Sequence, residues 1–88
     1  MDKLKVHNKR INAWLVVDCG KVYDEQTNIQ VPPSSRIALG AISYVKREME
    51  ALWDKMGEID PIWGDLQLYH QLEREWLRMR QALYGMAQ

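Results

Sequence analysis

The stretch SRIALGAISYVKREMEALWDKMG, residues 35–57, decides the fold of this chain. Its apolar residues recur at alternating spacings of four and three; they are Ala38, Ile42, Val45, Met49, Leu52 and Met56. That spacing places them on one face of an α-helix. Ser34 and Ser35 are both good N-caps, and Gly57 suits the position just after a helix. The sequence therefore predicts a long helix over residues 35–56.

A second stripe of the same kind follows a short connector. Its members are Tyr69, Leu72, Trp76, Met79, Leu83 and Met86. They predict a second helix over residues 66–84, with Asp65 as its cap. The connector contains Asp60-Pro61, which is typical of a capped single turn, and Gly64, which weakens any longer helix. Because the connector is short, the two helices should form an antiparallel helical hairpin.

Residues 1–31 show the pattern of β structure. Over residues 11–18, Leu15 and Val17 share one face while Trp14 falls on the other, which is the period of a half-buried strand. Gly20 marks a tight turn. Tight turns join antiparallel neighbours, so we expect a hairpin or a meander that ends before Pro32-Pro33. The expected strands cover residues 3–7, 11–18, 21–23 and 29–31.

The expected fold class is therefore α+β. A small N-terminal antiparallel β-sheet, as a hairpin or a meander, precedes two long antiparallel α-helices. Eighty-eight residues suit one small hydrophobic core, so we expect residues 1–88 to form a single domain.

The composition excludes several classes of protein. Twelve Lys and Arg balance twelve Asp and Glu, so the chain does not act through bulk charge, either as a nucleic-acid coat or as a DNA mimic. The longest apolar run, residues 13–17, is too short to cross a bilayer. Cys19 is the only cysteine, so no disulfide forms within the chain. We expect a cytoplasmic protein without membrane contact, in the host cytoplasm if the chain is phage-encoded.

Catalytic and metal motifs are absent from the sequence. His7, Cys19 and His70 lie far apart, with none of the short spacings that metal ligands use. Asp18 beside Cys19 should raise the pKa of the thiol, which opposes its use as a nucleophile. Asp18 and Asp24 bracket a hairpin and could meet as paired carboxylates, although both are typical turn formers. We expect no enzymatic activity, no cofactor and no metal.

Protein binding is the function that the sequence favours. All eight aromatic residues are Trp or Tyr, whose polar edges suit half-buried and interface positions. We expect Trp53 and Trp76 in the helix–helix core. The residues expected to contact a partner are Trp14, Tyr23, Trp63, Arg74 and Arg78. The predicted function is a small non-enzymatic module that docks on a larger protein and occludes or bridges it.

Two further expectations concern the partner. Inhibitors and accessory proteins of phages and mobile elements share this profile of a tiny, neutral, motif-free domain, and nucleic-acid-processing machinery is a natural target for them. The apolar seam of each helix could also be covered by a second copy, so a homodimer through the helices is a second expectation.

The alternative function is nucleic-acid binding. The residues expected to contact nucleic acid are Lys3, Lys5, Lys9, Arg10 and His70. His70, Arg74 and Arg78 are spaced by four, which places them on one helix face as a stripe for phosphates. Trp14 and Tyr23 could stack on bases beside the basic N-terminal strands.

Overall fold

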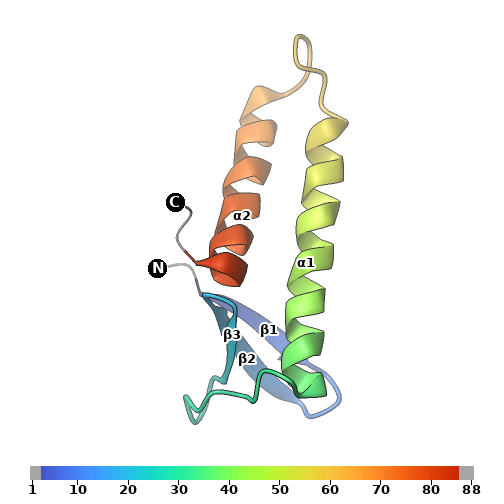
Figure 1. The fold of residues 1–88 in the computed structure, drawn as a ribbon. Coiled ribbons are helices and arrows are strands. Elements are labelled where there is room, and N and C mark those ends of the chain that lie inside the picture. Colours follow the sequence, from blue (N-terminus) through green and yellow to red (C-terminus); the bar gives the residue numbers. More distant parts are fainter. Residues whose placement is uncertain (1–2, 86–88) are drawn as a thin grey trace.

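The computed structural model describes residues 3–85, in which a three-stranded antiparallel sheet precedes two helices (Figure 1). The expected α+β fold with a helical hairpin is confirmed. The sheet lies at one end of the helix pair, and the connector between the helices lies at the other (Figure 1). In chain order the elements are β1 (Leu4–Asn8), β2 (Ala13–Asp18), β3 (Lys21–Asp24), α1 (Arg36–Gly57) and α2 (Leu66–Tyr84).

The sheet is a meander with one covered face and one open face. Val6 pairs with Leu15, and Val17 pairs with Val22; all four side chains are buried on the inner face. Trp14 points to the opposite face and is 50% exposed. The alternation predicted for residues 11–18 is therefore confirmed over residues 13–18.

The strands predicted over residues 3–7 and 21–23 differ from the structure by one residue at an end, and the other two differ more. Residues 29–31 form only an isolated bridge, between Gln30 and Tyr23, because Pro32 follows at once and cannot extend a ladder. The second strand begins at Ala13 and not at Ile11. The side-chain oxygen of Asn8 accepts hydrogen bonds from the backbone N–H groups of the next turn, which holds Ile11 outside the sheet.

The turn between β2 and β3 ties the sheet to the end of α2. Cys19 and Gly20 have φ values of 52° and 78°, as a two-residue hairpin turn requires. The Gly20 N–H donates to the carbonyl oxygen of Ala82 at 2.8 Å. A Cβ at Gly20 would lie 2.6 Å from the carbonyl oxygen of Leu83, so no larger residue fits without a shift. The tight turn predicted at Gly20 is confirmed.

The helix bounds follow the predicted stripes and caps. The Ser35 hydroxyl accepts from the Ala38 N–H at 3.2 Å, and the Asp65 carboxylate accepts from the Leu68 N–H at 3.1 Å. The start predicted for α1 differs by one residue, and the bounds predicted for α2 match. Gly57 was expected after the helix, but it is the last residue of α1, and Glu58 caps it in a right-handed conformation.

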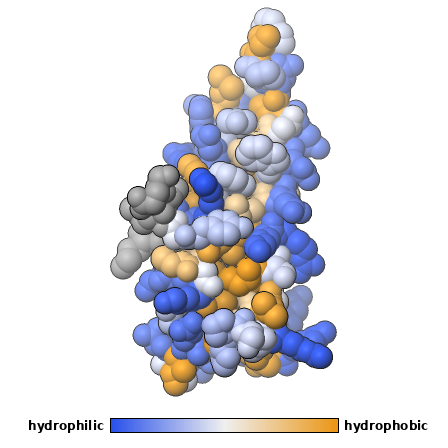
Figure 2. Space-filling view, viewed as in Figure 1, coloured by the Kyte–Doolittle hydropathy of each residue, from blue (hydrophilic) through white to orange (hydrophobic). Residues whose placement is uncertain are grey.

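The core lies where the helix pair meets the inner face of the sheet. Small residues on the helices let the sheet approach closely, and Figure 2 shows apolar residues gathered there between hydrophilic edges. The buried members of this core are Val6, Leu15, Val17, Val22, Ala38, Ala41, Val45, Ala82 and Leu83. All lie at the sheet end of the molecule.

Within residues 3–85, no third layer packs on the other half of the hairpin. On α1, Leu52 and Met56 are buried, whereas Trp76 on α2 is only half-buried. Trp53 was expected in the helix–helix core, and this is wrong, because its side chain is 61% exposed. One residue after Leu52, it is rotated by about 100° from the seam, and no other element covers it.

The connector is held by Asp60. Its carboxylate accepts from the backbone N–H groups of Ile62 and Trp63 at 2.8 and 2.9 Å, and the Gly64 N–H donates to the Asp60 carbonyl oxygen. The predicted capped single turn is confirmed. It presents Trp63 to solvent with 87% of its side chain exposed.

Leu15→Ala should lower the free energy of unfolding by about 2–5 kcal/mol, the usual cost of emptying a core position. Leu15 is 1% exposed and lies on the covered face of the sheet, in the core. Leu39→Ala on exposed α1 surface is the matched control and should change stability by less than about 0.5 kcal/mol. Urea unfolding followed by circular dichroism measures both. Equal effects would place Leu15 outside the core.

Asp60 makes stability depend on pH. The N–H groups of Trp63 and Ile62 hold the pKa of its carboxyl below the ordinary aspartate value. The stability that this carboxylate contributes is therefore complete above the ordinary pKa and is lost as the pH falls through the lower folded pKa. We expect the stability difference between the wild type and Asp60→Ala to shrink over that acidic range. A difference that stays constant with pH contradicts the assignment.

Candidate functional site

The structure does not assemble the residues that sequence reasoning weighed for catalysis. Asp18 lies opposite Lys21 and Asp24 opposite Leu15, so the two carboxylates are about 10 Å apart along the ladder. Cys19 lies beside Gly85 after the end of α2. His70, in the second turn of that helix, is therefore about 20 Å away.

Cys19 itself is a poor nucleophile. A hydrogen bond with the Asp18 side chain is the main cause that raises the pKa of the thiol above its ordinary value. The effect of Asp18 predicted from the sequence is confirmed. Residues 3–85 also contain no cluster of three His, Cys, Asp or Glu side chains that could hold a metal ion.

The five predicted partner contacts lie at separate places. Trp14 and Tyr23 share the open face of the sheet, on β2 and β3. Trp63 is on the connector at the opposite end of a molecule whose longest extent is 47 Å (Figure 1). Arg74 and Arg78 lie on exposed positions of α2. One compact partner surface cannot contact all five at once.

The open face of the sheet carries an aromatic pair. The rings of His7 and Trp14 lie with their centroids 5.0 Å apart, at an interplanar angle of 55°. Tyr23 of β3 lies on the same face, opposite Val16, which is two residues after Trp14 in β2. Lys5, a predicted nucleic-acid contact, is on the same face but pairs with Glu25 at 2.7 Å.

The basic stripe predicted on α2 is interrupted. His70 lies 3.5 Å from the Glu73 carboxylate. Arg78 lines a shallow hollow together with Glu75 and Leu4, so a carboxylate lies beside it as well. Lys3, which is exposed, precedes β1 at this end of the sheet, whereas Lys9 and Arg10 lie in the turn at the other end of β1. Lys3 therefore lies at the opposite end of β1 from Lys9 and Arg10, although all three are close in the sequence.

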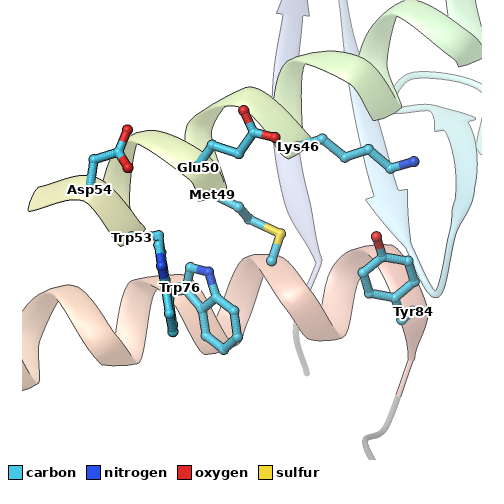
Figure 3. A pocket seen from close by; sticks show the side chains of 7 residues that line it. All are labelled: Lys46, Met49, Glu50, Trp53, Asp54, Trp76 and Tyr84. Carbon is cyan, nitrogen blue, oxygen red and sulfur yellow. The ribbon is translucent and has the colours of Figure 1, made fainter. Parts of the chain in front are cut away.

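An aromatic groove runs between the helices on one flank (Figure 3). Trp53 from α1 and Trp76 from α2 form its floor, with ring centroids 5.5 Å apart (Figure 3). The Arg80 guanidinium lies 5.8 Å from the centroid of the Trp76 ring. The groove has a volume of about 500 Å³. Its lining residues are Lys46, Met49, Glu50, Trp53, Asp54, Trp76 and Tyr84.

A basic groove lies between α1 and the β1–β2 hairpin. Its volume is about 440 Å³, and buried Val6, Leu15 and Ala41 form its apolar floor. Its polar lining residues are His7, Asn8, Lys9, Arg10, Arg36, Tyr44 and Arg47. No carboxylate is among the residues that line it.

The sequence did not predict the side of the basic groove that α1 forms. Lys9 and Arg10 were predicted, but Arg36, Tyr44 and Arg47 were not. A signal exists, because Arg36, Gly40, Tyr44 and Arg47 are spaced four, four and three and so share one helix face. In the sequence that face resembles an ordinary solvated surface. Only the fold shows that it faces the β1–β2 turn.

Gly40 opens the basic groove at a cost to the helix. A Cβ built at this position meets no atom within 4 Å. Gly40→Ala should therefore raise the free energy of unfolding by about 0.5–1 kcal/mol, the usual gain from replacing a glycine inside a helix. Gly20→Ala is the opposing control and should be destabilising, because its φ is positive and the Leu83 carbonyl is close. Thermal unfolding checks the pair. A destabilised Gly40→Ala variant means that the space is filled.

No helix within residues 3–85 has the length and apolar character needed to span a membrane. No protein-family model, no curated protein and no solved structure matches the chain.

Proposed function

We propose that this chain is a small protein-binding module, and that its aromatic groove takes one amphipathic helix of a larger protein. The observation that carries the proposal is the open Trp53–Trp76 pair between two long antiparallel helices. Trp53 is 61% exposed, and no helix or strand within residues 3–85 covers it. Exposed tryptophans are frequent centres of binding energy in protein interfaces.

A helix is the occupant that fits this groove best. Two antiparallel helices leave a long furrow along each flank, and a third helix laid into it completes a bundle. Met49 and the two tryptophans supply an apolar, adaptable floor for it. Tyr84 offers a hydroxyl at the sheet end of the furrow (Figure 3).

The charges on the rim give the docked helix a direction. Lys46, Glu50 and Asp54 follow one another at spacings of four along α1, so the rim is positive near the sheet and negative near the connector. A helix has a partial positive charge at its N-terminus and a partial negative charge at its C-terminus. The partner helix therefore fits with its N-terminus near Asp54 and runs antiparallel to α1.

The proposed mode of action is occlusion or bridging, without a chemical step. A partner helix held in the groove is covered along one side and cannot make its other contacts. An inhibitor or accessory protein in the cytoplasm, including one encoded by a phage, works in this way. Proteins that process nucleic acid carry cationic segments, which match the acidic connector end of the groove at Glu50 and Asp54.

Trp53→Ala tests the proposal. The immobilised wild type is exposed to nuclease-treated lysate of the cells that encode it, at high salt. A retained protein is then titrated in pure form by tryptophan fluorescence. We expect Trp53→Ala to weaken its binding by about 30-fold, the effect of a typical hot-spot residue, while the fold is kept, because Trp53 is a surface residue.

Trp63→Ala and Trp14→Ala are the matched controls, since both are exposed tryptophans outside the groove. Both should keep full binding. Loss in either control, with Trp53→Ala unaffected, places the docking site on the connector or the sheet and overturns the proposal. Sedimentation tests the remaining possible occupant, a second copy of this chain. If the wild type is a dimer and Trp53→Ala is a monomer, the groove takes that second copy.

A further inference from the structure

The basic groove gathers four basic side chains from two parts of the chain. Lys9 and Arg10 come from the β1–β2 turn, and Arg36 and Arg47 come from α1. The ion pairs within residues 3–85 are Lys5–Glu25 and His70–Glu73. None of the four groove cations has a carboxylate partner within that part of the chain. In a chain with no net charge, this is a marked local separation of charge.

The first turn of α1 adds to the positive potential of the basic groove. This positive charge does not stabilise the helix. A helix N-terminus carries a partial positive charge and favours acidic side chains. The first turn of α1 contains none and begins with Arg36. A cation at this position is unfavourable for the helix, but it is favourable for an anion bound in the groove.

Gly40 is the second feature that favours binding over stability. It lies between Arg36 and Tyr44 on the groove face of α1, and space surrounds its Cβ position. Glycine inside a helix is less stable than alanine. Its structural effect here is a gap through which a ligand can approach the helix backbone.

The turn that carries Lys9 and Arg10 is ordered in advance. The Asn8 side-chain oxygen accepts from the backbone N–H of Arg10 at 2.9 Å. Asn12, with φ of 47°, closes the turn, and its side-chain oxygen lies 3.3 Å from Nε2 of His7. A ligand therefore meets two cations on a shaped turn and loses less entropy on binding.

His7 joins this groove to the open face of the sheet. It lines the groove, and its ring packs against Trp14 on that face. Trp14 is half exposed, and Tyr44 on the other wall is 45% exposed. His7 on the edge strand β1 therefore borders both the groove and the aromatic pair on the opposite face of the sheet.

We propose that this surface, formed by the basic groove and the His7–Trp14 pair, binds single-stranded nucleic acid. Phosphates of the backbone lie against Lys9, Arg10, Arg36 and Arg47, and an unpaired base stacks on Trp14. Bases in a duplex have no free face for such stacking, whereas single strands do. The surface is distinct from the aromatic groove between the helices, so the inference goes beyond the proposed function and does not depend on it.

The test is fluorescence anisotropy with a labelled oligothymidylate of about 12 nucleotides, within the range that one small domain covers. Four phosphate contacts predict a slope of about −3 when the logarithm of affinity is plotted against that of salt concentration. A duplex of equal length and a polyglutamate chain are the competing probes. The single strand should bind tightest of the three at equal salt.

Four variants separate the parts of the surface. Replacing both Arg36 and Arg47 by Gln should reduce the slope to about −1.4 and weaken binding about five- to twentyfold. Trp14→Ala should weaken binding at least about fivefold while the slope stays the same. Gly40→Glu, which puts a carboxylate into the gap, should abolish binding without unfolding the helix. Gly40→Ala narrows the gap by one methyl group and adds no charge, so it should weaken binding far less than Gly40→Glu does.

The controls lie outside this surface. Arg74→Gln removes one cation from α2, and Trp53→Ala changes the aromatic groove; both should leave the affinity unchanged. Equal binding by the duplex, or tighter binding by polyglutamate, overturns the proposal in favour of duplex or acidic-protein recognition. The proposal is also overturned if the variant with both Arg36 and Arg47 replaced binds as the wild type does while Arg74→Gln loses binding. Circular dichroism and thermal unfolding confirm that each variant is folded.

Discussion

The packing of the inner sheet face against the base of the helix pair is the interaction on which the rest of the structure depends. A three-stranded meander buries too little surface to be stable alone. It is covered here because Ala38, Ala41 and Ala82 let Leu15 and Val17 come close to both helices. The buried helix residues of this core lie in the turns of α1 and α2 nearest the sheet. The connector half still carries large apolar side chains such as Trp53, Trp63 and Leu66, which stay exposed because no other element within residues 3–85 packs on them.

Two open surfaces follow from this arrangement, and they differ in chemistry. The flank between the helices keeps Trp53 exposed because no third layer reaches it. The corner between α1 and the β1–β2 turn keeps its cations because no carboxylate is placed there. The first suits the apolar face of a partner helix, and the second suits phosphate groups. The two surfaces share no lining residue.

The sequence alone predicts those features that depend on local periodicity. The two apolar stripes and the caps Ser35 and Asp65 give the helix bounds to within a residue, and alternation separates Leu15 from Trp14. Features that depend on a neighbour distant in the sequence were not predictable in this way. The exposure of Trp53 depends on a missing layer, which no spacing records. The basic groove needs Arg36 to lie beside Lys9, which is known only once the sheet is placed against the helices.

The hydrogen bond from Gly20 to Ala82 has a consequence for the order in which the molecule forms. The sheet comes first along the chain, yet its turn rests on the last turn of α2, and its inner face is covered in part by Ala82 and Leu83. During synthesis the apolar face of the finished strands therefore stays open until α2 has left the ribosome. Such long-range closure slows folding compared with a helical hairpin alone. It also makes folding cooperative, because neither layer is complete without the other.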